Sequence, residues 1–247
     1  MKFTPFYKIH LDLNAKMGLF GGYQMPIQYG RGVKQEHLSV RENLGVFDVS
    51  HMGEFMVEGP KAFDLLQYIC SNDIAKLYPG KAQYNYLPNE SGGIIDDLII
   101  YQLEAEKYLL VVNASNIEKD WQWINKCNQD FRSDISNISD KTALLAIQGP
   151  KALKAMQSLC DFDLKTLNNY CHTSTTFADC EDILVATTGY TGSGGIEIYF
   201  NCEHADTIWE SVMQAGDRFG ISPVGLAARD TLRIEMGYCL YGNEIND

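Results

Sequence analysis

Short segments rich in apolar residues lie between residues 82 and 114, and they predict β-strands. These segments are AQYNYLP (82–88), GGIIDDLIIYQL (92–103) and KYLLVVNA (107–114). They are rich in β-branched and aromatic residues and are separated by turn-forming stretches. Because the connections are short, we expect the strands to pair antiparallel, as a meander or a series of hairpins.

Apolar residues at helical spacing predict helices around these strands. Ile117, Trp121 and Ile124 fall on one helical face, and Ser115 with Glu118 has the spacing of a capping box. Further helices are predicted over 204–216 and 228–238.

Near the N-terminus, the stretch 37–45 predicts a short helix that ends at Gly45, where a glycine suits the end of a helix. A single strand is predicted to follow it over 47–59.

One pattern occurs twice along the chain. EFMVEGPKAFDLLQYIC (54–70) matches LLAIQGPKALKAMQSLC (144–160), 90 residues later. Each copy predicts a strand, a glycine turn, a helix that begins with proline, and a cysteine. Strand-turn-helix units are common, but the matched length and offsets favour a duplicated supersecondary unit.

The sequence therefore predicts an α+β fold of two interleaved subdomains, with mainly antiparallel sheets and flanking helices. We expect residues 1–50 and 140–247 to form one discontinuous subdomain, and residues 51–139 to form an inserted one. No linker rich in proline or serine divides the chain.

Composition narrows the function classes. The formal net charge of -12 argues against sequence-independent binding to nucleic acid, which needs clustered basic residues. No apolar run approaches the length of a membrane span, and the first residues, MKFTPFYKIHLDL, lack the apolar centre of a signal peptide. We therefore expect neither nucleic acid nor a membrane among the partners.

The cysteines and histidines give no sign of a disulfide framework or a metal site. The seven cysteines are scattered without a CxxC motif, and the five histidines form no HxxxH or HxH pair. This pattern is typical of reduced thiols in a protein core, and it predicts a cytoplasmic protein without a bound metal.

Two adjacent aspartates interrupt the apolar stretch GGIIDDLIIY. In a strand, Asp96 and Asp97 point to opposite faces, so they do not form a paired-carboxylate dyad. One alternative is that one of them faces solvent and the other caps a turn or bulge. The other is that one is a partly desolvated carboxylate that accepts a hydrogen bond, or a proton, from a ligand amine.

Glu197 and Arg229, in the C-terminal part of the chain, are further candidates for a polar site. The glycine-rich TGYTGSGG (188–195) precedes a strand, so it fits neither a phosphate loop nor a dinucleotide-binding turn. Glu197 lies in that strand on the face opposite Ile196 and Ile198, where a solvated position is the simpler alternative. On the helix over 228–238, Arg229 shares a face with Arg233, and Arg233 is spaced to pair with Asp230. A surface charge network is the default explanation of these residues.

Six segments, in the same order along the chain, resemble the aminomethyltransferase family, the T-proteins of the glycine cleavage system. The segments are FDVSHMGEF (47–55), GGIIDDLIIY (92–101), VVNASNIEKDW (111–121), SNISDKTALLAIQGPKA (136–152), TGYTGSGGIEIY (188–199) and GLAARDTLRIEMGYCLYGNEI (225–245). The resemblance implies transfer of a one-carbon unit from the aminomethyl-lipoyl arm of H-protein to tetrahydrofolate. Ammonia and 5,10-methylenetetrahydrofolate would be the products.

The resemblance also implies roles for single residues. Asp97 matches the key aspartate of the family, near the reacting nitrogens of the folate. The positions that match the folate-binding residues of the family are Met52, Tyr84, Asn113, Tyr170, Tyr190, Glu197, Arg229 and Tyr238. A carboxylate such as Glu197 suits the adjacent N–H donors of a pterin, whereas Arg229 suits either a carboxylate of the folate tail or Glu197.

The chain departs from the family pattern in three places. TGYTGSGG lacks the usual acidic residues, Ala227 replaces a usual glycine, and the third, barrel-like domain of the family with its pocket arginine is not among these 247 residues. The alternatives are a folate-binding module without transferase activity and an iron–sulfur-assembly relative of the same fold. MGYCLYGNEI differs from the KGCYxGQE motif of that relative, which favours the transferase. A third alternative is the folate-dependent domain of a flavin amine dehydrogenase. The lack of a dinucleotide-binding segment in the sequence argues against it.

Overall fold

The computed structural model describes all 247 residues and divides them into two compact units. The first unit contains residues 1–51 and 141–238, and the second contains residues 52–140 and 239–247. The predicted α+β class with mainly antiparallel sheets is confirmed. The last nine residues, which the sequence pattern grouped with the first unit, lie with the second, where Ile94 N–H donates to the carbonyl of Asn246 (2.8 Å).

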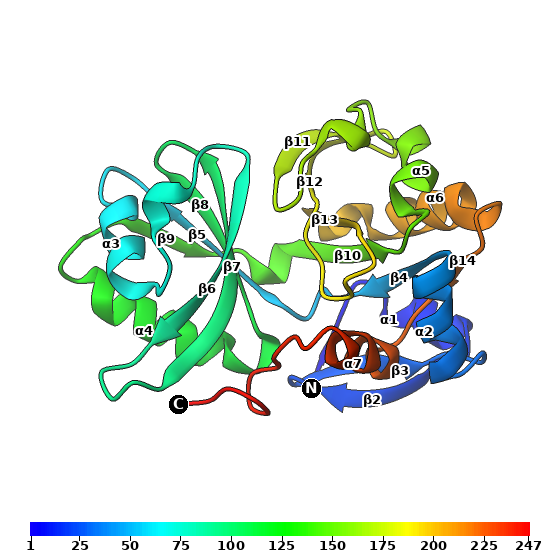
Figure 1. The fold of residues 1–247 in the computed structure, drawn as a ribbon, viewed down its shortest axis with the longest axis horizontal. Coiled ribbons are helices and arrows are strands. Elements are labelled where there is room, and N and C mark those ends of the chain that lie inside the picture. The colour runs from blue at the N-terminus through cyan, green and yellow to red at the C-terminus, as the bar shows by residue number, and fades with distance from the viewer. The chain divides into compact units, whose positions relative to one another are not determined.

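The second unit is one antiparallel sheet with helices on one face (Figure 1). In spatial order its strands are β6 (Lys81–Pro88), β7 (Ile94–Glu104), β8 (Lys107–Val112), β5 (Gly53–Glu58) and β9 (Asp134–Asn137). Its helices are α3 (Ala62–Ile69) and α4 (Ile117–Asn128), with 3-10 turns η1 (Ile74–Lys76), η2 (Ala114–Asn116) and η3 (Ser139–Lys141). The three strands predicted between 82 and 114 are thus confirmed as an antiparallel meander.

The core of the second unit lies between the sheet and its helices. Leu98 and Ile100 of β7 contribute to it together with Leu66 of α3 and Ile124 of α4. Because side chains alternate along a strand, the residues between them point to the other face of the sheet. Leu98 and Ile100 therefore point toward the helices, and Asp97 and Ile99 point away from them.

The first unit is built around a six-stranded sheet. In spatial order its strands are β11 (His172–Phe177), β12 (Cys180–Ala186), β13 (Gly195–Asn201), β10 (Thr142–Gln148), β4 (Leu44–Asp48) and β14 (Ile221–Pro223). Within this sheet, β14 and β4 pair parallel and all other neighbours pair antiparallel. A small sheet adds β1 (Lys2–Phe3), β3 (Tyr23–Gln28) and β2 (Lys16–Phe20).

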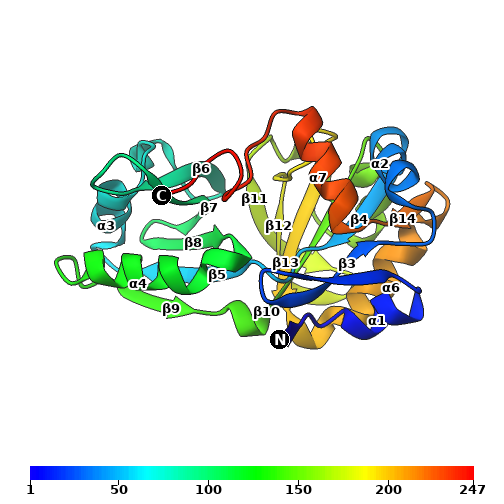
Figure 2. The same ribbon diagram turned by 90° about the horizontal axis from the view of Figure 1, so that it is seen from below.

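Helices cover the large sheet of the first unit, as Figure 2 shows. They are α1 (Tyr7–Asp12), α2 (Val33–Glu42), α5 (Ala152–Met156), α6 (Ala205–Asp217) and α7 (Leu226–Glu235), with 3-10 turns η4 (Gln157–Leu159), η5 (Leu164–Thr166) and η6 (Cys202–His204). Ile196 and Ile198 of β13 pack in one core with Met156 of α5 and Ile208 of α6. None of the helices in the chain has the length and hydropathy that crossing a bilayer requires.

The two copies of the repeated pattern fold alike. In each, a strand (β5 or β10) reaches a glycine in the left-handed region, Gly59 (φ 102°) or Gly149 (φ 133°), and a helix follows. The likeness continues beyond the matched sequences, because the side-chain oxygens of Gln67 and Gln157 each accept a bond of 2.9 Å from the first residue of a 3-10 turn. Each unit then continues with three antiparallel strands and a helix.

Two details of the sequence prediction were wrong. The helix predicted to end at Gly45 ends at Glu42, and Gly45 lies inside β4, where a Cβ atom would come within 2.4 Å of a methyl group of Val224. Glycine is therefore needed for close packing and not for a helix cap. The strand predicted over 47–59 is two strands, β4 and β5, which belong to different sheets because the chain leaves the first unit after His51.

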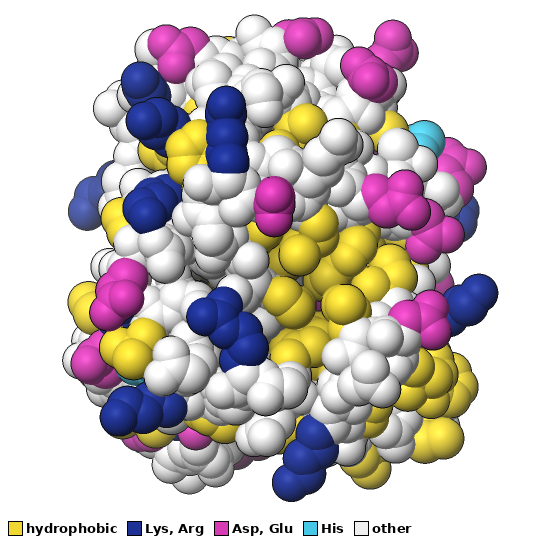
Figure 3. All heavy atoms as spheres, turned by 90° about the vertical axis from the view of Figure 1, so that its right-hand side faces the viewer, with side chains coloured by type: hydrophobic (Ala, Val, Ile, Leu, Met, Phe, Trp, Pro, Cys, Tyr) yellow, Lys and Arg dark blue, Asp and Glu magenta, His cyan; other side chains and the backbone are white.

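All seven cysteines are free, and four of them are buried. Apolar side chains are also exposed on the surface. On one face of the first unit they form a patch between acidic and basic side chains (Figure 3). The most exposed ones near the N-terminus are Met1, Phe3, Leu11, Leu13 and Leu19.

Candidate functional site

The two adjacent aspartates of β7 lie on opposite faces of the sheet, as strand alternation predicts. Asp96 is fully buried on the helix-facing side, whereas Asp97 is half-buried on the other side. A carboxylate with water access on a rigid strand can meet a ligand, and a fully buried one cannot. Of the two, Asp97 is therefore the candidate for chemistry.

Two donors hold the Asp97 carboxylate. The Tyr84 hydroxyl donates to Oδ2 (2.7 Å), and the Asn113 amide donates to Oδ1 (2.8 Å). Burial raises the pKa of Asp97 above its usual value, the two hydrogen bonds oppose this effect, and the nearby Asp96 charge adds to it. The structure thus brings three of the predicted residues into one group, with a carboxyl group that is more basic than usual.

A fourth residue of this group carried no sequence signal. Tyr86 lies directly opposite Asp97 in the register of β6 and β7, and its ring centroid is 5.3 Å from that of Tyr84. The alternation of AQYNYLP places both tyrosines on one face, but the face was identifiable only once the pairing with β7 was known. Together the two rings form an aromatic wall beside the Asp97 carboxylate.

The buried Asp96 is held by amide groups. It accepts bonds from the Asn113 backbone N–H (3.0 Å), the Asn113 side chain (2.8 Å) and the Asn116 side chain (2.7 Å). These donors explain how a carboxylate stays inside an apolar strand. They also explain why the predicted capping box fails: Ser115 lies within η2, and the actual N-cap of α4, Asn116, turns its side chain to Asp96 instead.

In the first unit, Glu197 occupies the face of β13 opposite the core, as predicted, but it is buried (7% exposed) and not solvated. The Thr188 hydroxyl donates to its Oε2 (2.5 Å). Burial raises the pKa of Glu197, while this bond and the charge of Arg229 lower it. A second oxygen of the carboxylate remains available for a donor from outside the chain.

Arg229 has no ion pair or side-chain hydrogen bond, although its positive charge lowers the pKa of Glu197. Its guanidinium carbon lies 4.6 Å from the ring centroid of Tyr190. The Tyr190 ring in turn stacks on the ring of Tyr238 (5.8 Å between centroids, 26° between planes). The arrangement is a layer of arginine and two tyrosines in which the N–H donors of the guanidinium are unpaired.

Tyr238 is placed by an arginine whose role sequence reasoning left open. Arg233 is buried and donates to the carbonyl of Tyr238 (3.0 Å) and to the Asp230 carboxylate (2.8 Å). Asp230 and Arg233, three residues apart on α7, thus form an ion pair. It is structural, because it fixes the turn after α7 that carries Tyr238.

The glycine-rich loop before β13 is fastened by two residues that the sequence analysis missed. The buried Gln148 donates to the carbonyls of Thr188 and Ile196 (both 3.2 Å) and accepts from Thr191 (2.8 Å). Arg41 of α2 joins the loop to α7, since it donates to the hydroxyl of Ser193, to carbonyls of both segments and to Glu235. The sequence signal for Gln148 was a polar residue at the end of an otherwise apolar strand.

Two further predicted residues are Tyr170 and Met52. Tyr170 adopts a left-handed backbone (φ 56°) just before β11, and burial, followed by the charges of Glu197 and Tyr238, raises its pKa. Tyr170 lies in the same unit as Glu197 and Tyr238. Met52 is half-buried in the turn before β5 and makes no polar contact with the other predicted residues.

His51, which the sequence analysis did not single out, is buried with its Nδ1 atom unpartnered. Burial lowers its pKa to about 4, with a smaller contribution from Arg229, so the imidazole is neutral at physiological pH.

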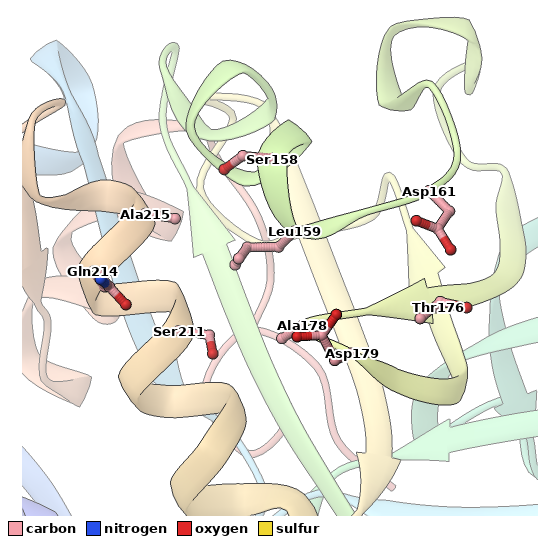
Figure 4. Close-up of a pocket in the computed structure, with 9 residues that line it drawn as sticks. All are labelled: Ser158, Leu159, Asp161, Thr176, Ala178, Asp179, Ser211, Gln214 and Ala215. Carbon is pink, nitrogen blue, oxygen red and sulfur yellow. The ribbon is translucent and has the colours of Figure 1, made fainter.

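A hollow of about 430 Å³ lies elsewhere in the first unit, between α6 and the turn that joins β11 to β12 (Figure 4). Its lining is mainly polar and includes Asp161, Asp179 and Gln214. None of the residues predicted for the site contributes to it. No group of three or more His, Cys, Asp or Glu side chains in the chain has an arrangement suited to a metal ion.

The chain is similar over its whole length to one family of proteins. The family model described as GCVT N-terminal domain matches residues 6–247. The aminomethyltransferases of Flavobacterium psychrophilum and Bacteroides thetaiotaomicron are 58% and 55% identical to it, over 100% of this chain and 68% of each relative.

Solved structures give the same result. The glycine cleavage system aminomethyltransferase T from Bartonella henselae has a TM-score of 0.91 and 38% sequence identity, and the match covers 99% of this chain and 65% of that one. The heterotetrameric sarcosine oxidase from Corynebacterium sp. U-96 has a TM-score of 0.60 at 12% identity, over 90% of this chain, and shares the fold alone. The chain therefore spans about two thirds of the length of the aminomethyltransferases that it matches.

Proposed function

Since the chain belongs to the aminomethyltransferase family with the GCVT N-terminal domain, we propose that it transfers a one-carbon unit to tetrahydrofolate. The donor is the aminomethyl group on the lipoyl arm of H-protein, and the products are ammonia and 5,10-methylenetetrahydrofolate. H-protein is accordingly the proposed partner, and the cytoplasm is the proposed compartment. The name of the related structure from Bartonella henselae, an aminomethyltransferase of the glycine cleavage system, supports this assignment.

The reaction exchanges bonds without oxidation or reduction. The methylene carbon loses its bonds to sulfur and to the amino nitrogen, and it gains bonds to N5 and N10 of the folate. The two protons released from N5 and N10 end on the thiol sulfur and on ammonia. The chemistry therefore needs a group that aligns the folate nitrogens and moves protons at neutral pH.

Asp97 is the proposed group for this task, and its geometry is the observation that carries the proposal. Its carboxyl group is half-buried, is fixed by Tyr84 and Asn113, and has a raised pKa. A carboxylate of this kind accepts a proton more readily than an exposed one, and general acid–base groups typically contribute about 10²–10⁴-fold to rate. Asp97 would accept the proton of a folate nitrogen as that nitrogen attacks the methylene carbon.

The proposed folate-binding residues divide by chemistry. Glu197, with one oxygen held by Thr188, would accept N–H bonds from the pterin ring. Tyr190 and Tyr238 form a stacked aromatic surface that suits the flat parts of the folate. The unpaired guanidinium of Arg229 would bind a carboxylate of the folate tail, and this assignment is favoured over an ion pair with Glu197 because the structure contains no such pair.

Met52 and Tyr170 complete the proposed set with apolar and aromatic contacts. Tyr84 and Asn113 act through Asp97.

Release of ammonia from aminomethylated H-protein, measured with and without tetrahydrofolate, tests the proposal. We expect release to be strongly accelerated by the folate and to be matched by formation of methylenetetrahydrofolate. Measurable folate affinity without folate-dependent release would instead indicate a binding module that has lost transfer activity. The absence of both would contradict the proposed folate site.

A further inference from the structure

Asp120 is a buried carboxyl group that the proposed function does not use. It lies on α4, its side chain is 0% exposed, and neither of its oxygens meets a hydrogen-bond donor of the protein. An ionised carboxylate in such a place would be an uncompensated buried charge, which is strongly unfavourable. The Asp120 side chain must therefore be a neutral acid with one O–H donor of its own.

The neighbour of Asp120 is the carboxylate of Asp96. Asn116 lies one helical turn before Asp120 at the start of α4 and donates to Oδ1 of Asp96 (2.7 Å), so Asp120 occupies the face of α4 that meets Asp96. Two ionised carboxylates could not share a hydrogen bond there, because neither would carry a hydrogen atom. Asp96 receives three N–H donors from Asn113 and Asn116, whereas Asp120 receives none. This unequal supply of donors places the negative charge on Asp96 and the proton on Asp120.

The other charged groups near Asp120 do not change this distribution. Lys119, the neighbouring residue on α4, lowers the pKa of Asp120, but its ammonium group is bound to the hydroxyl of Tyr241 (2.6 Å) and to Asp247 (3.2 Å). The charge of Asp97 acts in the same direction as that of Asp96. Burial first, and Asp96 second, raise the pKa of Asp120 to about 10.

We propose that Asp120 is a positioning residue: it stays protonated at physiological pH and donates its O–H to Asp96, which in turn holds the Asn113 amide against Asp97. The contacts form a chain from α4 to the far face of the sheet. Asn113 Nδ2 lies 2.8 Å from Oδ1 of Asp96 and 2.8 Å from Oδ1 of Asp97. The direction of this one amide therefore depends on how Asp96 is oriented, and it sets the orientation of Asp97.

This inference rests on the proposed role of Asp97 in transfer. Asp120 itself is not a catalytic group, because it has no contact with solvent and so cannot reach a substrate. Asn116 adds a second fixed donor from the start of α4. Without the Asp120 O–H, Asp96 keeps its amide donors but loses one of the two donors that reach it from α4.

Two substitutions of similar volume test the proposal. Asp120→Asn keeps a donor toward Asp96, since the amide N–H replaces the acid O–H, whereas Asp120→Leu removes the donor. We expect Asp120→Asn to lower kcat for transfer by less than about tenfold, because one neutral hydrogen bond replaces another. We expect Asp120→Leu to lower kcat by on the order of 10²-fold, the cost of a misplaced reacting group, with the Kd for tetrahydrofolate unchanged.

The pH dependence separates positioning from a general loss of packing. In Asp120→Leu, the acidic limb of the kcat profile should shift, because Asp97 loses its fixed contact with Asn113, whereas Asp120→Asn should keep the wild-type profile. Equal loss of activity in both variants would overturn the proposal, because it would mean that the charge of Asp120 matters. Wild-type kcat in Asp120→Leu would overturn it as well.

A measurement on the unmodified protein covers the case in which Asp120→Leu does not fold or the protein has no transfer activity. The side-chain carboxyl carbon of Asp120, identified in ¹³C NMR by its disappearance in Asp120→Asn, should keep the chemical shift of a protonated acid from about pH 5 to pH 9, where an ordinary aspartate is ionised. Titration near pH 4 would overturn the proposal. Because this measurement needs no turnover, it distinguishes failure of the inference from failure of the proposed function.

Discussion

Asp96 and Asp97 point to opposite faces of β7, yet one oxygen of each lies 2.8 Å from the same nitrogen, Nδ2 of Asn113. The loop after β8 thus links the buried side of the sheet to the side on which the proposed reacting carboxylate lies. Asp96 is structural, because it is fully buried and amide donors hold it within the core. Asp97 is the one that keeps access to a ligand.

The first prediction concerns the carboxylate of Asp97. Asp97→Asn keeps the shape of the side chain but removes its ability to take a proton. We expect the rate of folate-dependent ammonia release to fall by about 10²–10⁴-fold, while the Kd for tetrahydrofolate changes little. Single-turnover kinetics with aminomethylated H-protein would measure the rate. The matched control is Asp134→Asn, an exposed aspartate on β9 of the same sheet, and normal turnover of Asp97→Asn would refute the catalytic role.

The second prediction concerns the hydrogen bond from Tyr84 to Asp97. This bond favours the ionised form of Asp97, so its loss in Tyr84→Phe should raise the pKa of Asp97 further. Activity requires the ionised base, and it falls as pH drops through that pKa. The acidic limb of the rate profile should therefore move to higher pH by roughly one unit, the equivalent of one charge-assisted hydrogen bond. Tyr78→Phe, at an exposed tyrosine, should leave the profile in place.

The third prediction concerns recognition of the folate by Glu197. Glu197→Gln keeps one oxygen acceptor for Thr188 but replaces the other oxygen with an amide N–H₂ group, which opposes the N–H donors of a pterin. We expect the Kd for tetrahydrofolate to rise by on the order of 10–10²-fold, as for loss of a hydrogen bond to a charged group. Isothermal titration would measure it, with the exposed Glu203→Gln as control. Unchanged affinity would remove Glu197 from the proposed site.

The fourth prediction concerns stability and pH. Glu54 on β5 is fully buried, both of its carboxyl oxygens lack a partner, and burial raises its pKa well above the usual value. The folded state therefore holds this proton more tightly than the unfolded state does, and its stability contribution is lost as pH rises above the unfolded pKa.

Glu54→Gln removes that loss, because the amide is neutral at every pH. We expect the variant to match the wild type near about pH 4 and to exceed it by at least about 1 kcal/mol in free energy of unfolding near pH 8. Urea unfolding at the two pH values measures the difference, and Glu106→Gln, at an exposed turn, is the control. A gain that is independent of pH would show that burial of an ionised Glu54 is not the cause.

Much of the fold followed from local patterns. Strand alternation separated Asp96 from Asp97 and put Glu197 opposite Ile196 and Ile198, and the structure agrees. The repeated glycine-proline turn was identifiable because both copies need a glycine with positive φ at the same offset. What failed were the boundaries near His51 and at Ser115, where a longer-range contact overrode the local signal.

The sequence by itself determined the elements, the α+β class and the polar residues that resemble those of the aminomethyltransferases. It did so because alternation, helical spacing and turn chemistry act over a few residues. Only the tertiary structure decided that Asp120 is buried without a donor, that Asn113 joins two carboxylates, and that Arg41 and Gln148 fasten the loop before Glu197. Most of these contacts join residues far apart in the chain, and strand register decides which residues meet. A polar group that is buried away from water needs a partner inside the protein, and no local sequence pattern reveals which residue that partner is.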